Sequence, residues 1–222
     1  MNTVGINTRK GISSGVKIAI IDYGMGNIAS VRKACIHFGA SAGVVTRPKE
    51  LGRVDKIILP GVGAFGDAMR QLTKMGLDSE IEEKISAGMP FLGICLGMHL
   101  LFEKSEESKG VKGLGILKGR VVKFKGMEIK VPHMGWNQIK IKYQKSNIKN
   151  AVLKGVKDNS YVYFCHSYYV APVDKNIVAA TTDYGGKFAS VIAKDNIFGI
   201  QFHPEKSQRT GLKILEDFIK LC

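Results

Sequence analysis

Two glycines that flank a cysteine constrain this chain most strongly. The segment Gly93-Ile-Cys95-Leu-Gly97 directly follows the apolar run Pro90-Phe-Leu92. Glycine adopts backbone conformations that other residues avoid, so this pattern predicts a buried strand that turns sharply into a helix. In such a turn the side chain between the two glycines stands exposed at the carboxyl edge of a sheet. The segment therefore favours an α/β fold with Cys95 at that edge.

Apolar runs alternate with helical patterns through the first half of the chain. This alternation predicts a doubly wound, flavodoxin-like α/β fold, with a mixed, mainly parallel sheet and flanking helices. The predicted strands are 17–21, 44–45, 56–59 and 91–94, and the predicted helices are 27–38, 67–75, 78–87 and 96–103.

The pattern becomes strand-rich after residue 110. Strands are predicted at 120–125, 138–143, 161–170, 177–183, 188–194 and 197–202, and a last helix at 211–221. No linker or internal repeat separates the two halves, so we expect one domain over residues 17–222, a length that allows a full core. Residues 1–16 are polar and contain Gly and Ser, which predicts a flexible N-terminal extension or an artificial remnant, not a secretory signal.

Charge and cysteine usage narrow the classes of function. The net charge is +14, but the lysines are spread along the chain and no aromatic residues interleave with them, so we expect a solvated basic surface and no nucleic-acid site. No apolar run is long enough to span a membrane. The four cysteines have neither C-x-x-C nor zinc-ligand spacing, which predicts free thiols, no metal and a cytoplasmic location.

A glycine motif near the N-terminus suggests a competing function. Gly24-Met-Gly26-Asn-Ile-Ala29 follows the first predicted strand, as in dinucleotide-binding proteins. The second predicted strand, however, ends Thr46-Arg47-Pro48, with no acidic residue to hold a ribose. We therefore interpret the motif as a tight turn and expect no cofactor.

A histidine and a glutamate follow the last predicted strand. His203-Pro-Glu205 comes directly after the run Ile197-Phe-Gly-Ile-Gln-Phe202. A thiol becomes a strong nucleophile when a base takes its proton, and the base works best when a third group orients it. Cys95, His203 and Glu205 supply one residue of each kind, all at strand ends, and are predicted to be catalytic.

Five motifs in order resemble one family. GICLGM around Cys95 and FGIQFHPEKS around His203 resemble the class I (triad) glutamine amidotransferases. The segments beginning at Pro60 (PGVGAF), Pro132 (PHMGWN) and Tyr163 (YFCHSY) are similar to the glutaminase subunits of imidazole glycerol phosphate synthase, which supply ammonia for histidine biosynthesis. The resemblance covers residues 17–221.

The resemblance implies a role for each matching residue. Cys95 attacks glutamine, His203 acts as base and then as acid, and Glu205 orients the imidazole. The oxyanion is held by the backbone of Leu96 and by the segment Gly61, Val62 and Gly63, although a plain tight turn is the alternative for that segment. The substrate pocket also includes His99, Glu107, Ser167 and Tyr168.

The resemblance also implies a partner. It is a (β/α)₈-barrel cyclase that forms a heterodimer with the glutaminase and receives its ammonia through a channel. The implied interface residues are Asn27, Met134, Trp136, Asn137, Tyr163 and Lys206.

One position departs from the family pattern. The family carries glutamine where this chain has His99, and that glutamine helps to hold the substrate. We expect His99 to bind the substrate instead, or to stabilise the Cys95 thiolate as an imidazolium. The departure leaves two alternatives open, a related ammonia supplier to another synthase and a non-catalytic regulatory relative.

Overall fold

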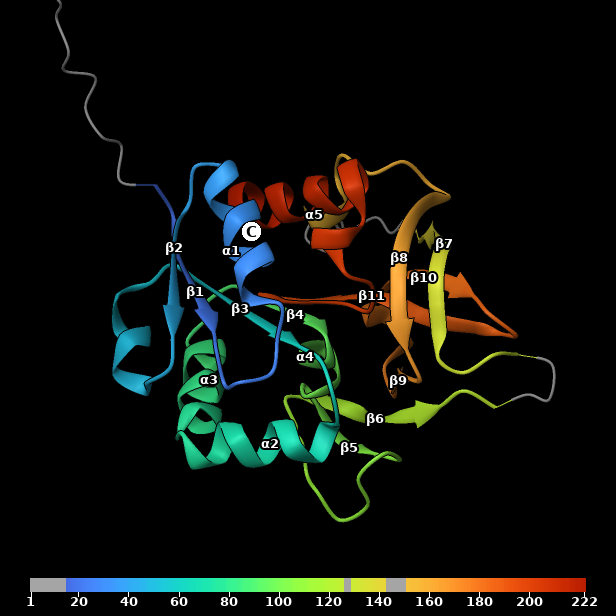
Figure 1. The fold of residues 1–222 in the computed structure, drawn as a ribbon, viewed down its shortest axis with the longest axis horizontal. Helices are drawn as coiled ribbons and strands as arrows, with labels where there is room; N and C mark the ends of the chain where they lie inside the picture. Colours follow the sequence, from blue (N-terminus) through green and yellow to red (C-terminus); the bar gives the residue numbers. More distant parts are fainter. Residues whose placement is uncertain (1–14, 126–128, 143–150) are drawn as a thin grey trace, which may run out of the picture.

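The structure is a computed structural model that describes residues 15–125, 129–142 and 151–222. The expected extension at residues 1–16 lies outside the described residues except for Gly15 and Val16. Figure 1 shows a large twisted sheet with helices on both faces. Among the described residues, no helix combines the length and hydrophobicity needed to cross a bilayer.

Nine strands form the main sheet in the order β2-β1-β3-β4-β12-β11-β10-β7-β8. The first five run parallel, whereas the last four pair antiparallel. The strands are β1 (Lys17–Ile21), β2 (Ser41–Val45), β3 (Lys56–Gly61), β4 (Phe91–Cys95), β7 (His133–Ile141), β8 (Ser160–His166), β10 (Val178–Asp183), β11 (Lys187–Lys194) and β12 (Ile197–Ile200).

Three further strands form a small second sheet in the order β5-β6-β9. They are β5 (Phe102–Ser105), β6 (Leu117–Lys123) and β9 (Tyr168–Pro172). The prediction of one strand over 161–170 is therefore wrong, because the chain leaves the main sheet at Ser167 and continues in the small one. Ser167 does not pair in either sheet but accepts a hydrogen bond on its carbonyl from the backbone N–H of Phe124.

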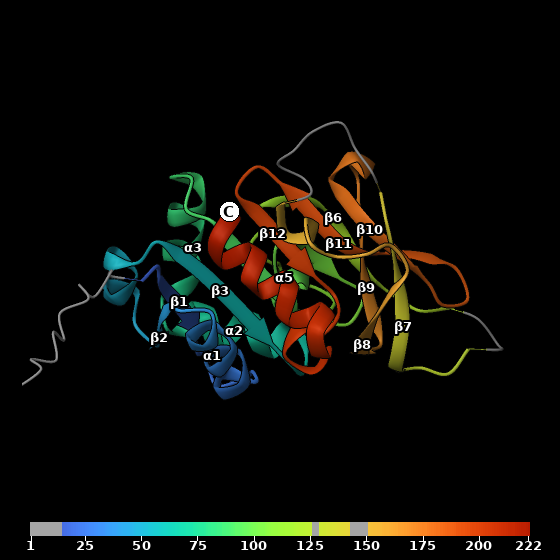
Figure 2. The same cartoon turned by 90° about the horizontal axis from the view of Figure 1, so that it is seen from above.

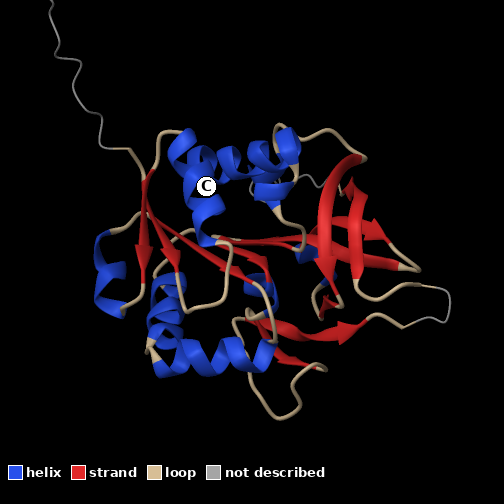
Figure 3. Cartoon of the chain, viewed as in Figure 1, coloured by secondary structure: helices blue, strands red, loops and turns tan. Residues whose placement is uncertain are grey.

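Helices cover both faces of the parallel half, α1 and α5 on one side and α2 and α3 on the other (Figures 1 and 3). They are α1 (Ile28–His37), α2 (Phe65–Lys74), α3 (Leu77–Ser86), α4 (Leu96–His99) and α5 (Gln208–Leu221), with short 3₁₀ turns at Pro48–Arg53, Lys175–Ile177 and Pro204–Lys206. Helix α2 buries Phe65, Ala68, Met69 and Leu72, a spacing that places them on one face.

The helix predicted over 96–103 is wrong beyond its first turn. Helix α4 ends at His99, and the strand β5 begins at Phe102. The apolar residues Leu100 and Leu101, which continue the helical pattern in the sequence, are fully buried in the turn between these elements. The other predicted elements are present, with ends displaced by a few residues; Tyr143 of the strand predicted at 138–143 lies outside the described residues.

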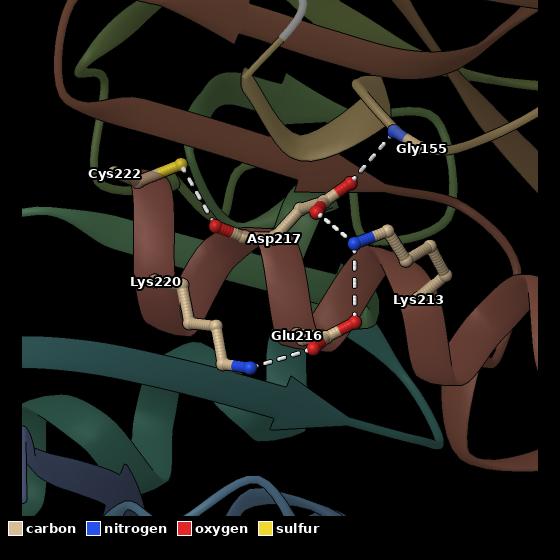
Figure 4. A network of polar contacts seen from close by, with 6 residues as sticks. All are labelled: Gly155, Lys213, Glu216, Asp217, Lys220 and Cys222. Carbon is tan, nitrogen blue, oxygen red and sulfur yellow. Dashed lines mark hydrogen bonds and ion pairs between the residues drawn. The ribbon is translucent and has the colours of Figure 1, made fainter.

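The terminal helix α5 lies across the main sheet beside α1 (Figure 2). A polar network holds it, centred on the buried Asp217 (Figure 4). The Asp217 carboxylate accepts from Lys213 Nζ at 2.8 Å and from the backbone N–H of Gly155 at 3.1 Å. Glu216, one residue earlier, pairs with Lys213 and Lys220 at the surface. The network therefore links α5 to the segment that precedes β8.

Candidate active site

Cys95 is the last residue of β4 and immediately precedes α4. Its φ of 54° and ψ of −109° are unusual for a residue with a side chain. The turn is tight, because a Cβ placed on Gly93 would lie 2.6 Å from the carbonyl oxygen of Gly97. The predicted elbow is therefore present, but the Cys95 side chain is buried and not exposed as expected, because the walls of a cavity surround it. The neighbouring strand β12 brings the His203 segment to the same edge.

His203 and Glu205 form a buried pair beside this elbow. His203 Nδ1 lies 3.1 Å from Glu205 Oε1, and both side chains are almost fully buried. The same carboxylate oxygen accepts a hydrogen bond from Asn27 Nδ2 at 3.2 Å. Asn27, expected at the partner interface, thus contacts the orienting carboxylate. With Nδ1 occupied by Glu205, Nε2 is the ring nitrogen left to interact with Cys95, which lines the same cavity.

The electrostatics of the pair favour a charged imidazole. Burial alone would lower the pKa of His203, but the hydrogen bonds to Cys95 and Glu205 outweigh burial and raise it. Burial likewise would raise the pKa of Glu205, and the hydrogen bond and charge of His203 reverse this and lower it. Glu205 therefore remains a carboxylate and stabilises an imidazolium at His203.

A cavity of about 300 Å³ opens beside Cys95 and His203. It is lined by every residue predicted for the oxyanion site and the substrate pocket except Gly61, namely Val62, Gly63, Leu96, His99, Glu107, Ser167 and Tyr168. Lys206, from the predicted interface set, also lines it. Gly61 instead pairs with Cys95 across β3 and β4, and a Cβ on it would meet the hydroxyl of Tyr23 at 2.4 Å.

Glu107 presents a carboxylate to this cavity from a fixed position. Its Oε2 accepts a hydrogen bond of 2.8 Å from the backbone N–H of Phe65, the first residue of α2. The positive end of the helix dipole favours a carboxylate there. The cavity therefore has a negative group that can receive an ammonium group of a ligand.

His99 contacts Gln201, a residue outside the predicted site. His99 Nε2 lies 2.8 Å from Gln201 Oε1, and Gln201 Nε2 lies 3.8 Å from Cys95 Sγ. Burial lowers the pKa of His99 to about 4, so the ring is neutral near pH 7. The expectation of an imidazolium at His99 is therefore wrong. Gln201 lies within the motif FGIQFHPEKS, but nothing in the sequence indicated that its amide reaches Cys95.

An exposed aromatic patch adjoins the cavity at Lys206. The ring of Tyr163 lies 5.8 Å from Lys206 Nζ and 6.1 Å from the ring of Trp136. Met134 and Trp136 are 61% and 47% exposed, high for large apolar side chains on one strand. Asn137, predicted for the same interface, donates from Nδ2 to the carbonyl of Asp183 and lies 3.3 Å from His133 Nε2.

Two buried histidines connect β7 to the cavity. His166 Nδ1 lies 2.8 Å from the carbonyl oxygen of Tyr168, which can only accept, so the ring donates there. His166 Nε2 then accepts from His133 Nδ1 at 3.0 Å. His133 Nε2 in turn accepts from Asn137 Nδ2 at 3.3 Å. Both rings are neutral in this chain of hydrogen bonds, which the sequence had not indicated.

The described residues contain no group of three or more His, Cys, Asp or Glu side chains placed to hold a metal ion. The glutamine amidotransferase class-I family matches residues 19–221. The chain is 51% identical over 205 residues to the imidazole glycerol phosphate synthase subunit HisH of Methanocaldococcus jannaschii, covering 92% of this chain and 99% of that relative. The chain belongs to the class I glutamine amidotransferases, among the HisH subunits.

Other similar proteins support the assignment of this amidotransferase to its family. It is 48% identical over 204 residues to the HisH subunit of Aquifex aeolicus, covering 91% of this chain and 96% of that one. The solved structure of PurLQS from Thermotoga maritima has a TM-score of 0.72 at 18% identity, covering 92% and 97% of the two chains. That likeness shows the amidotransferase fold, and the HisH relatives place the chain within the family.

Proposed function

We propose that this chain is the glutaminase subunit of an imidazole glycerol phosphate synthase, hydrolysing L-glutamine to glutamate and ammonia. The observation that carries the proposal is the arrangement of Cys95, His203 and Glu205 around one cavity. The HisH relatives support the choice of synthase. No cofactor is needed, because a thiolate and an imidazole suffice for amide hydrolysis.

Each residue of the triad has its own role in glutamine hydrolysis. Cys95 Sγ attacks the side-chain carbonyl of glutamine after its proton passes to His203. His203 then protonates the departing ammonia, which leaves a γ-glutamyl thioester on Cys95. Water, activated by His203, hydrolyses the thioester to glutamate and regenerates the thiol. Glu205 holds the imidazole in position and stabilises its charged form.

The oxyanion of each tetrahedral intermediate needs two donors. Leu96 is the first residue of α4, and its backbone N–H is one donor. The second comes from the Val62–Gly63 segment, which follows β3 and lines the cavity. Gly63 has a φ of +91°, so its neighbouring peptides can rotate with less steric cost than in a chain without glycine. A rotation there would turn an N–H toward the cavity.

The partner of the proposed subunit is a (β/α)₈-barrel cyclase, with which it forms a heterodimer. The patch of Met134, Trp136, Tyr163 and Lys206 supports this docking site, because it is exposed, aromatic and contiguous with the cavity through Lys206. Docking there would cover the cavity mouth, so ammonia released at Cys95 would enter the barrel before reaching water.

The central experiment replaces the nucleophile. Cys95→Ala should abolish glutamine hydrolysis, whereas the complex with its cyclase should still make product from added ammonium salts. Cys165→Ser, which changes the other cysteine of the same cavity, should retain glutamine-dependent activity. Glutaminase activity that persists in Cys95→Ala would refute the proposal.

A further inference from the structure

The wall of the cavity behind Cys95 contains a second polar connection that the triad does not use. It runs from His99, on the first turn after the elbow, to Gln201, directly after β12, and from there to Cys95. All three side chains are buried, and Gln201 is fully so. The backbone of Gln201 is itself fixed by a 2.9 Å hydrogen bond to the carbonyl of Ser190 on β11.

The chemistry of the thiolate fixes the direction of these hydrogen bonds. A thiolate can only accept, so the amide nitrogen of Gln201 must face Cys95 Sγ, and the amide oxygen must face His99. His99 then donates from Nε2 to that oxygen. If the amide were flipped, its oxygen would face the thiolate, and two acceptors would then oppose each other.

The protonation state of His99 determines how it acts on Gln201. Because the ring is neutral near pH 7, it contributes a hydrogen-bond donor and no positive charge. A donor on the amide oxygen polarises the amide N–H and strengthens its bond to the sulfur. Hydrogen bonds to charged acceptors are stronger than those to neutral ones, so the connection favours the thiolate over the thiol.

We infer that His99 is a positioning residue that acts through Gln201 to hold Cys95 as a thiolate, and that it does not serve as the substrate contact expected from its position in the family motif. This inference rests on the proposed function, since it assigns His99 and Gln201 a part in preparing the nucleophile. It also explains how histidine at this position is compatible with an intact triad.

The test is the rate at which iodoacetamide alkylates each cysteine at pH 7.0, without glutamine, followed by mass spectrometry of the peptides. Alkylation requires the thiolate, so its rate reports on the nucleophile directly. Gln201→Met should slow modification of Cys95 about tenfold, and His99→Phe about threefold or more. Cys165, in the same cavity, should react at an unchanged rate and so reports on access and folding.

Two further variants separate positioning from packing. If His99 acts through Gln201, the double variant should be no slower than Gln201→Met alone, because effects through one shared group do not add. His99→Gln supplies an amide donor and should recover at least half of the native rate. Steady-state kinetics should show a lower kcat with nearly unchanged KM for glutamine in His99→Phe.

Three outcomes would overturn the inference. The first is a native alkylation rate at Cys95 in both single variants. The second is additive slowing in the double variant, and the third is a raised KM with unchanged kcat, which would make His99 a substrate contact. If His99→Phe fails to fold, Gln201→Met and His99→Gln still decide, since native Cys95 reactivity in Gln201→Met refutes the connection. Failure here leaves the proposed function standing, because that depends on Cys95→Ala.

Discussion

A methyl group on Gly97 would lie 1.8 Å from the carbonyl oxygen of Leu59. Helix α4 therefore packs directly on the backbone of β3, the strand that leads to the Val62–Gly63 segment. The contact fixes the distance between the nucleophile elbow and the second proposed oxyanion donor. Since the obstacle is a strand backbone inside the sheet, it has little freedom to move aside.

Gly97→Ala should accordingly displace α4 from β3, lowering stability by several kcal/mol and reducing glutaminase activity by more than tenfold. Urea unfolding and steady-state kinetics measure the two effects. Gly52→Ala is the matched control, because a Cβ at Gly52 meets nothing within 4 Å. Native stability and activity in the Gly97→Ala variant would show that the elbow tolerates a wider gap.

Glu205→Gln should lower kcat while leaving the protein folded. The amide cannot stabilise an imidazolium as a carboxylate does, so we expect a loss of about 10²-fold or more, smaller than that of His203→Ala. Asn27→Ala should have a milder effect in the same direction, because it removes one donor to Glu205 Oε1. Glu83→Gln, a surface change, serves as control. Full activity in Glu205→Gln would remove Glu205 from the proposed triad.

Asp217 should contribute much more to stability than its neighbour Glu216. Asp217→Asn leaves Lys213 without its buried partner and weakens the link to Gly155, so we expect a loss of about 2–3 kcal/mol. Glu216→Gln removes only surface ion pairs and should cost less than about 1 kcal/mol. Chemical denaturation compares the two directly. Equal losses of stability would mean that the buried contacts of Asp217 contribute no more than the surface ion pairs of Glu216.

Stability should fall as the pH drops from about 6.5 toward 4. Burial lowers the pKa of His99 and His133 to about 4, and that of His166 well below its ordinary value. Below pH 6.5 these histidines bind protons in the unfolded chain but remain neutral in the folded chain. Each buried histidine therefore lowers the free energy of unfolding by up to roughly 1.4 kcal/mol per pH unit.

Urea unfolding at pH 7.0 and 5.0 measures this loss. His99→Gln should reduce the difference between the two pH values by about 1–2 kcal/mol, because one group no longer titrates. His37→Gln changes an exposed histidine and should leave the difference unaltered. The same loss of stability between pH 7.0 and 5.0 in the native protein and in both variants would contradict the assignment to His99.

Glutaminase activity should be low in the isolated subunit and rise when a barrel cyclase with its ligand binds. The reason is the proposed peptide rotation after β3, whose population docking can shift. Turnover of glutamine by the free subunit, by the complex and by a complex carrying Trp136→Ala measures the effect. Equal turnover in all three would argue that the second oxyanion donor is already in place.

The sequence predicted the parts of the site that depend on local patterns. The elbow at Cys95 follows from two glycines after a buried strand, and the position of His203 at a strand end follows from the apolar run before it. The pairing of that strand with β4 comes from the structure alone. The short α4 could not be predicted, because Leu100 and Leu101 match a helical spacing but are buried in a turn. The break at Ser167 could not be predicted either, because it depends on which sheet each half of the apolar segment joins. The contact of Gln201 with Cys95 could not be predicted either, since only the register of β12 against β4 turns the amide toward the sulfur.

The strand β12 lies between β4 and β11, although it is the last strand in the chain. During synthesis the preceding strands leave the ribosome with a gap in the middle of the sheet, and the thiol of Cys95 has no base beside it. The strand that fills the gap also delivers His203 and Glu205. Completion of the sheet and assembly of the triad are thus one event, so a chain that ends before β12 or has not yet placed it lacks the base that glutamine hydrolysis needs.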